Sequence, residues 1–310
     1  MKCAVVTLPI LEVDARALMT NNVQASGSGM CIDFLVMRLN AQVTGSNKGI
    51  GLAIMRALCK DFDGDVYLTA RDGGRGQQAV QDLGKENLHP KFHQLDITSK
   101  ESIGKLKEFL EKNYGGLDVL VNNAGIMYKR TSTAPFTEQA EVSLACNFFG
   151  TVDVCDALFP LLRPHSRVVH VSSRAGTVVL GKMGKELVSK FRSSTLTQTE
   201  LIALMNQFVS DVKAGNHEAK GWYNCAYGTS KLGVIALTAL QVRAMAGDSR
   251  EDILINSCCP GGVATDLYPQ GSKTPDQGAE TPVYLALLPV NAGKPQGEFL
   301  RKKKVIPWML

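Results

Sequence analysis

Apolar residues follow one alternating rhythm from about residue 43 to the end of the chain. Short apolar or β-branched runs, typical of buried strands, lie at 66–70, 92–96, 117–121, 167–172 and 253–259. Apolar residues recur at helical spacing over 50–60, 100–112, 138–162 and 230–245. Strands that alternate with helices predict a parallel sheet with helices on both faces. The predicted fold class is therefore α/β: a single doubly wound, Rossmann-type domain over residues 41–310.

Two segments depart from this rhythm. Residues 1–40 lack a clear period and include the Gly/Ser-rich stretch 25–29, so we expect an irregular N-terminal extension. Residues 181–222 predict two helices, 182–190 and 199–213, inserted between a strand and the next long helix. A long insertion of this kind usually shapes a pocket or covers a surface.

The first strand carries unexpected polar residues. A central strand of a parallel sheet is buried on both faces, yet residues 38–43 include Asn40 and Gln42. Each buried amide would cost about 1–3 kcal/mol if it found no partner. Either this strand is shortened, or the fold is weakened beside the segment that follows it.

That following segment is a glycine loop. Gly45, Gly49 and Gly51 lie between the first strand and a helix, in the spacing Gly-x-x-x-Gly-x-Gly. Glycines at this place allow a tight turn, and they let backbone N–H groups approach a pyrophosphate at the helix N-terminus. A glycine cluster alone would more often be a plain turn, but its place between strand and helix favours a dinucleotide.

The end of the second strand indicates which dinucleotide binds. Arg71 stands where an NAD site needs a carboxylate, and Lys48 lies within the glycine loop. Two cations that converge there would suit the 2′-phosphate of NADP(H). The alternative is that both are surface charges and that Asp72 caps the next helix. Asp96, after the third strand, could accept a hydrogen bond from the adenine amino group or cap a helix.

Tyr227 and Lys231 are four residues apart and would share one face of a helix. A cation within about 4–6 Å lowers the pKa of an acid by roughly 1–3 units. We therefore expect Lys231 to lower the pKa of Tyr227 and to bring it toward a useful general acid. Alone this pair is a weak signal; together with the glycine loop it indicates an oxidoreductase.

Composition excludes several other classes. The chain has 310 residues, 45% of them hydrophobic, and a net charge of +5. Its densest basic run, 301–304, is expected to be a solvated tail rather than a nucleic-acid site. No uninterrupted apolar run reaches the ~18–20 residues of a membrane span, and no secretory signal is expected. The eight scattered cysteines, without a metal-binding pattern, predict a reduced, cytoplasmic protein. Cys258 and Cys259 could be reactive, but buried small hydrophobes are the more common case.

Several motifs together resemble the short-chain dehydrogenases/reductases, and most closely their monomeric, NADPH-dependent, carbonyl-reducing members. In chain order these motifs are Thr44-Gly45-x3-Gly49-Ile50-Gly51, Asn122-Asn123-Ala124-Gly125, Asn147, Ser172-Ser173, Tyr227-x3-Lys231 and Pro260-Gly261. The resemblance covers about residues 43–300. It implies that the chain uses NADP(H) to reduce ketones, aldehydes or quinones, that its partner is this small-molecule substrate, and that the inserted helices cover the surface through which other members oligomerise.

The resemblance also implies residue roles. Tyr227 would donate the proton, Lys231 would hold the nicotinamide ribose and lower the tyrosine pKa, and Ser173, rather than Ser172, would hydrogen-bond the substrate oxygen. Asn147 would anchor a proton-carrying water, and Thr265 would contact the nicotinamide amide. The cofactor-binding set implied is Gly45, Asn47, Lys48, Gly49, Ile50, Gly51, Arg71, Asp96, Ile97, Asn123, Ala124, Gly125, Tyr227, Lys231, Pro260, Gly261, Val263 and Thr265.

Departures from the family pattern keep alternatives open. The similar carbonyl-reducing proteins carry tryptophan where Gly262 stands, so the substrate pocket should be wider here. Met183, Met205 and Trp222 of the insertion could line that pocket or form local core. The polar first strand leaves two further hypotheses. The chain could be a weakly active or inactive paralogue that acts in binding or regulation, or it could be a hydroxysteroid or prostaglandin dehydrogenase.

Overall fold

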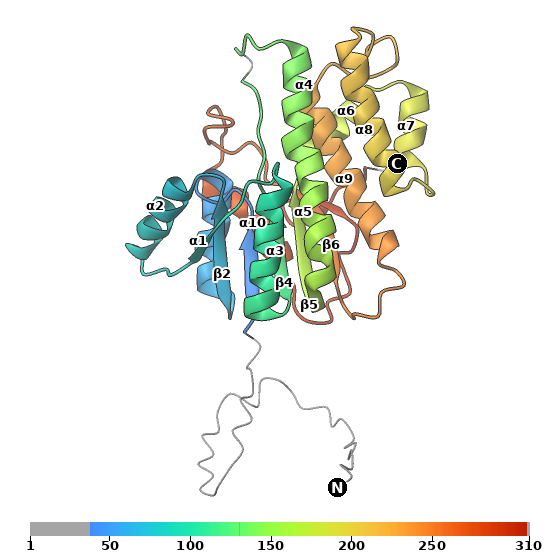
Figure 1. The fold of residues 1–310 in the computed structure, drawn as a ribbon. Coiled ribbons are helices and arrows are strands. Elements are labelled where there is room, and N and C mark those ends of the chain that lie inside the picture. The colour runs from blue at the N-terminus through green and yellow to red at the C-terminus, as the bar shows by residue number, and fades with distance from the viewer. Residues whose placement is uncertain (1–37, 130, 309–310) are drawn as a thin grey trace, which may run out of the picture. The chain divides into compact units, whose positions relative to one another are not determined.

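The computed structural model describes residues 38–129 and 131–308. Residues 1–37 lie outside this part, and so does nearly all of the irregular extension expected from the sequence. The described residues belong to one compact unit, and Figure 1 shows its central sheet with helices on both faces. The α/β, doubly wound fold class is therefore confirmed.

Eight strands form the sheet in the order β3-β2-β1-β4-β5-β6-β7-β8. They are β1 (Asn40–Val43), β2 (Asp65–Ala70), β3 (Lys91–Gln94), β4 (Leu117–Asn122), β5 (Leu162–Val171), β6 (Leu254–Cys259), β7 (Phe299–Arg301) and β8 (Lys304–Val305). All neighbouring pairs are parallel except β7 and β8. The order reverses direction between β1 and β4, which is the position where doubly wound sheets bind ligands.

Within the described residues, ten α-helices connect and cover the strands. They are α1 (Gly49–Asp61), α2 (Gly73–Gly84), α3 (Lys100–Tyr114), α4 (Phe136–Leu144), α5 (Gly150–Leu158), α6 (Arg174–Leu180), α7 (Lys185–Arg192), α8 (Gln198–Lys213), α9 (Ala226–Ala244) and α10 (Pro275–Ala286). Apolar side chains of α1, α2 and α10 form one core with Ala41 and Val43 of β1. Those of α3 and α5 form a second core with Tyr67 and Leu120. Because successive side chains of a strand point to opposite faces, the strands contribute apolar side chains to the cores on both faces of the sheet.

The insertion differs in detail from its prediction. The second predicted helix agrees with α8, but the first one, at 182–190, lies at Lys185–Arg192 as α7. A third helix, α6, begins directly after Ser173 and was not predicted, because its seven residues are too few to show a period. α8 packs against α4 and α9, and α6 packs against α9; Figure 1 shows α7 and α8 on the right-hand flank of the ribbon.

The predicted helix 138–162 is a composite. A π-helical turn at Ala145–Phe149 separates α4 from α5, and a short 3-10 turn ends the stretch at Leu161. Among the described residues, Phe136–Leu161 is the one helical stretch whose length and composition would suffice to cross a bilayer, and 56% of its most apolar window is buried inside the protein. Most of its apolar surface is thus used as core.

β1 is short, and its two amides have different surroundings. Asn40 is fully buried; its Nδ2 donates to Gly116 O at 2.9 Å and to Asp118 Oδ2 at 3.3 Å. Gln42 is also fully buried, and neither Oε1 nor Nε2 has a hydrogen-bond partner among the described residues. The strand is therefore shortened, as one of the two hypotheses held, and it also retains an unpaired amide.

Candidate active site

The candidate residues gather at one edge of the sheet. Because parallel strands end together, the segments that follow β1, β2, β3, β4, β5 and β6 meet at their carboxyl ends. These segments carry the glycine loop (45–51), Arg71, Asp96 with Ile97, the run 123–125, Ser173 and the loop 260–265, respectively. Asn147 joins them from the π-helical turn, and Tyr227 with Lys231 from the first turns of α9.

The segment after β4 holds the glycine loop in place. Thr44 Oγ1 accepts hydrogen bonds from the backbone N–H groups of Asn123 and Ala124, both at 2.9 Å. The amide of Asn123 donates in return to Thr44 O at 2.9 Å and to Gly45 O at 3.0 Å. The side chain of Asn123 therefore fixes two loops against each other.

The glycine loop has the conformation that a dinucleotide pyrophosphate needs. Gly45 and Gly49 have φ values of 60° and 58°, which side-chain-bearing residues rarely adopt. A Cβ at Gly51 would lie 2.5 Å from Asn123 Nδ2. No side chain caps the N-terminus of α1, where Lys48 is the preceding residue. Its first N–H groups are therefore left for an anionic group, so these residues fit a dinucleotide.

The amide of Asn147 links three parts of the site. Its Oδ1 accepts from Ile126 N at 2.8 Å, and its Nδ2 donates to Ile126 O at 2.9 Å and to Ser230 Oγ at 3.0 Å. Ser230 Oγ donates to Tyr227 O at 2.8 Å. Asn147 thus ties the segment after β4 to the turn of α9 that carries Tyr227.

Lys231 lies on the same face of α9 as Tyr227, as the spacing predicts. Its Nζ is 5.9 Å from the centroid of the Tyr227 ring and donates to Val171 O at 2.8 Å. Ser172 Oγ donates to Lys231 O at 2.8 Å. Ser172 is therefore occupied in fixing the backbone of α9, whereas Ser173 hydrogen-bonds Tyr227 and lowers its pKa.

The expectation that the pKa of Tyr227 lies below its usual value is wrong. Burial raises the pKa of Tyr227 to about 12, and the hydrogen bond from Ser173 offsets only part of this effect. Burial also lowers the pKa of Lys231 to about 8. Removal from water disfavours both charged forms, so the two pKa values move in opposite directions.

Two glycines allow α6 and α9 to approach closely. A Cβ at Gly176 of α6 would lie 2.7 Å from Leu232 N, and one at Gly228 of α9 would lie 2.3 Å from a methyl group of Val179. Ser173 is the N-cap of α6, where its hydroxyl accepts from Ala175 N. Close packing of these helices therefore sets the position of Ser173 relative to Tyr227.

The two cations expected at the 2′-phosphate differ in their ion pairs. Lys48 Nζ forms an ion pair with Asp266 Oδ2 at 2.8 Å, and Arg71 forms no ion pair among the described residues. Asp72 caps α2 by accepting from Arg75 N. Asp96 Oδ1 accepts from the N–H and the hydroxyl of Thr98. It does not cap α3, whose N-cap is Ser99, so the helix-cap alternative for Asp96 is wrong.

The loop after β6 lies against the glycine loop. A methyl group of Thr265 is 3.3 Å from the position of a Cβ on Gly49. Val263, like Gly262, lies in this loop, and Lys273 N donates to Gly262 O. The space in front of Gly262 contains only the edge of Tyr268, 3.5 Å from a Cβ placed there. Because residue 262 is a glycine, the ring of Tyr268 is the side chain that lies next to this position among the described residues.

The apolar residues of the insertion form core. Trp222, Met205 and Met183 belong to one buried cluster with Phe191 and Phe208, so the local-core alternative is confirmed for them. Cys258 and Cys259 are buried too, as expected, and burial raises the pKa of the Cys258 thiol. Among the described residues, no cluster of His, Cys, Asp and Glu could hold a metal ion.

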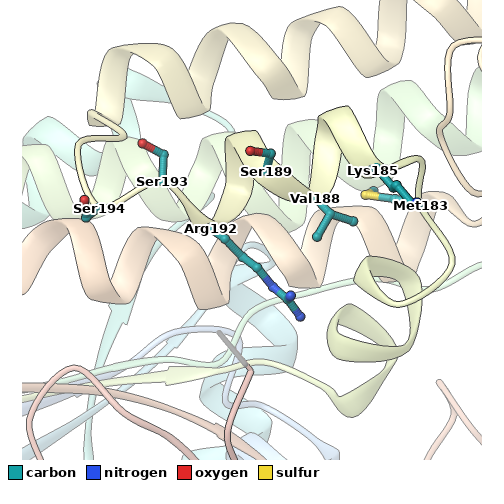
Figure 2. A pocket seen from close by; sticks show the side chains of 7 residues that line it. All are labelled: Met183, Lys185, Val188, Ser189, Arg192, Ser193 and Ser194. Carbon is teal, nitrogen blue, oxygen red and sulfur yellow. The ribbon is translucent and has the colours of Figure 1, made fainter.

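A hollow of about 520 Å³ lies along α7 and is lined by Met183, Lys185, Val188, Ser189, Arg192, Ser193 and Ser194. Figure 2 shows the hydroxyl-bearing and basic side chains along this helix. None of the predicted site residues lines it, so the hollow is separate from the candidate active site.

Sequence reasoning missed four participants: Ser230, which connects Asn147 to Tyr227; Gly176 and Gly228; and Asp266. Ser230 lies inside the Tyr-x-x-x-Lys spacing and could have been considered as a helix-facing hydroxyl. No sequence signal marks the other three, because their partners are distant in the chain.

The fold, the glycine loop and the Tyr227–Lys231 pair define an oxidoreductase of the Rossmann type. The chain belongs to the short chain dehydrogenase family, whose model matches residues 40–200. It is 55% identical over 270 residues to carbonyl reductase [NADPH] 1 of Bos taurus, which covers 86% of this chain and 98% of that protein. It is 54% identical, with the same coverage, to carbonyl reductase [NADPH] 1 of Homo sapiens.

Solved structures agree with this assignment. Salutaridine reductase from Papaver somniferum superposes with a TM-score of 0.75 at 31% identity and covers 84% of this chain and 99% of its own. Menthone neomenthol reductase from Mentha piperita gives 0.71 at 27% identity and covers 84% of this chain and 98% of its own.

Proposed function

We propose that this chain reduces carbonyl compounds (ketones, aldehydes or quinones) to alcohols, with NADPH as the reductant. The observation that carries this proposal is the arrangement of Ser173, Tyr227 and Lys231 beside an uncapped glycine loop, at the edge where doubly wound sheets bind ligands. Relatives at about 55% identity bear the name carbonyl reductase [NADPH].

The residues that would hold the cofactor follow from the fit of the glycine loop. The N–H groups at the start of α1 would receive the pyrophosphate, and Lys231 would contact the ribose hydroxyls of the nicotinamide. Arg71 and Lys48 would neutralise the 2′-phosphate. When bound, NADPH supplies the hydride that reduces the carbonyl carbon.

Tyr227 would give its proton to the carbonyl oxygen as negative charge develops there. With a pKa of about 12 it is fully protonated at neutral pH, so the acid form is always available. The Ser173 hydroxyl, already hydrogen-bonded to Tyr227, would donate to the same oxygen and stabilise the developing charge. Its other hydrogen bond, from Ala175 N, fixes the direction in which it can donate.

Asn147 would act as a positioning residue. Its amide already makes three hydrogen bonds, to both backbone groups of Ile126 and to Ser230. A proton-carrying water would therefore bind at the main-chain carbonyl of Asn147, which also accepts a hydrogen bond from Thr151 Oγ1 at 3.0 Å. The Asn147 side chain would fix the position of this carbonyl relative to Tyr227.

We further infer a cytoplasmic monomer without nucleic-acid or membrane partners. The six cysteines of the described residues are free thiols, as expected in a reducing compartment. Helix α8 packs on α4 and α9 and covers apolar surface that would otherwise be available to a second copy. The basic run 301–304 belongs to the solvated edge of the sheet, where lysines discourage strand pairing.

The alternatives have less support. An inactive paralogue would explain the polar strand β1, but the side chains of Ser172, Ser230 and Lys231 are hydrogen-bonded, and β1 pairs in parallel register on both sides. A hydroxysteroid or prostaglandin dehydrogenase would use the same site in the oxidative direction, and no residue described here favours a steroid or a prostanoid.

Substitution Tyr227→Phe tests the proposal. We expect turnover of a quinone or ketone with NADPH to fall by about 10²–10⁴-fold, because the general acid is lost, while NADPH binding by fluorescence titration stays nearly intact. Tyr223→Phe is the matched control, since it removes a phenolic hydroxyl that only accepts from Lys182 Nζ. An unchanged turnover number in Tyr227→Phe would exclude the assigned role.

A further inference from the structure

The ion pair between Lys48 and Asp266 joins the glycine loop to the loop after β6. The two atoms, Nζ and Oδ2, are 2.8 Å apart, although the side chains are 63% and 80% exposed. Lys48 makes no capping hydrogen bond to α1. The ammonium group expected at the 2′-phosphate is thus directed to a carboxylate from another element.

The fold places Asp266 at this position. Thr265 and Tyr268 exchange backbone hydrogen bonds around it, and Ala264 N donates to Lys273 O further out in the loop. Thr265 also contacts Gly49, the residue next to Lys48. The carboxylate is therefore held above the start of α1 by backbone contacts on both sides.

Two lysines act on the carboxylate of Asp266. Lys48 and Lys129 both lower the pKa of Asp266, so the carboxylate is ionised at neutral pH. A phosphate dianion bound to Lys48 would lie beside this carboxylate, and like charges at such separations repel. Any phosphate on Lys48 must therefore displace Asp266 or tolerate it.

We propose that Asp266 is a selectivity residue that competes with the 2′-phosphate of NADP(H) for Lys48. This inference rests on the proposed function. It moderates the preference for NADP(H) over NAD(H) and hastens release of the phosphorylated cofactor. Fast release is useful to a reductase because departure of the product or cofactor often limits turnover.

The experiment compares Asp266→Asn with the unaltered full-length chain by fluorescence titration with NADPH and NADH. We expect NADPH to bind about two- to five-fold more tightly, the range that an exposed ion pair supports, and NADH to bind unchanged. The fragment 2′,5′-ADP should also bind more tightly to Asp266→Asn, as NADPH does, because it retains the 2′-phosphate.

The matched control is Asp276→Asn. Asp276 is a second exposed carboxylate, on α10, that pairs with Arg56 of α1 at 3.1 Å. We expect no change in the affinity ratio of NADPH to NADH in this variant. A double variant, Lys48→Ala with Asp266→Asn, should bind NADPH no better than Lys48→Ala alone, because the competition requires the lysine.

Two results would overturn the inference. Equal weakening of NADPH and NADH in Asp266→Asn would show that the pair only holds the loop closed. An unchanged NADPH affinity, at both low and high salt, would show that the phosphate does not meet this carboxylate. Failure of the unaltered chain to bind NADPH at all would instead overturn the proposed function itself, and the inference with it.

Discussion

β1 and β5 are both interior strands of the same sheet, and both carry buried polar side chains. In β5, Arg167 Nη2 pairs with Asp252 Oδ2 at 2.9 Å, and His170 Nε2 lies 2.8 Å from Gln241 Oε1. In β1, Asn40 is only partly paired and Gln42 not at all among the described residues. Arg167 and His170 of β5 thus have hydrogen-bond partners, whereas Gln42 of β1 has none among the described residues.

The neighbours explain the difference. Gln42 lies opposite Tyr67 of β2 and Leu120 of β4. The Tyr67 hydroxyl is already hydrogen-bonded to Tyr114 at 2.8 Å, and Leu120 offers nothing polar. β5 instead faces α9, which provides the amide of Gln241. Whether a buried polar side chain of this sheet is hydrogen-bonded therefore depends on what the adjacent elements supply.

The largest expected effect comes from breaking the pairing in β5. Arg167→Met leaves Asp252, which is 7% exposed, without its buried cation. We expect the free energy of unfolding to fall by about 3–5 kcal/mol, because an ionised carboxylate would remain buried and under-compensated. Chemical denaturation measures this change. Arg56→Met, at a more exposed pair, should cost no more than about 1 kcal/mol, and equal losses in the two variants would contradict the comparison.

A second effect is visible in the pH dependence of stability. Burial lowers the pKa of His170 to about 4, from 6.5. Between pH 6.5 and 4, His170 is protonated in the unfolded chain but stays neutral in the folded protein. The free energy of unfolding therefore decreases as the pH falls through this window. We expect His170 to contribute roughly 2–3 kcal/mol of this loss.

The measurement is the free energy of unfolding at pH 7 and at pH 4.5. His170→Gln should show a smaller difference between the two pH values, whatever its absolute stability. An identical pH dependence in both proteins would mean that His170 is not held neutral.

The smallest expected effect concerns the two buried amides of β1. Gln42→Leu removes an unpaired amide from an apolar environment, so we expect stability to rise by up to about 1–3 kcal/mol. Asn40→Leu should have the opposite sign, because Asn40 Nδ2 donates to Gly116 O. Thermal unfolding of both variants checks this pair. A loss of stability in Gln42→Leu would show that this amide has a partner after all.

Much of the fold and of the candidate site could be predicted from the sequence. The strand and helix rhythm identified the sheet, and β2, β4 and β6 begin or end within a residue or two of their predictions. The residues of the site follow the ends of six strands, as the motifs require. The short helix α6 escaped prediction because one face of seven residues shows no period, and β3 ends at Gln94, before Asp96, where pairing with β2 stops.

The sequence by itself determined which chemical groups the protein has and which of them share an element. Tyr227 and Lys231 face the same way because four residues make about one helical turn, whatever surrounds them. Glycine at 45, 49 and 51 permits a loop that other residues could not form, and this too is local.

Only the tertiary structure decided what those groups experience. The pKa of Tyr227 rises because burial outweighs the effect of Ser173, Lys48 meets Asp266 more than 200 residues away in the chain, and Gln42 meets no partner among the described residues. Desolvation and pairing depend on all atoms within a few ångströms, and those atoms come from distant segments. Spacing along the chain therefore predicts which chemical groups form the site, and packing determines their pKa values and their partners.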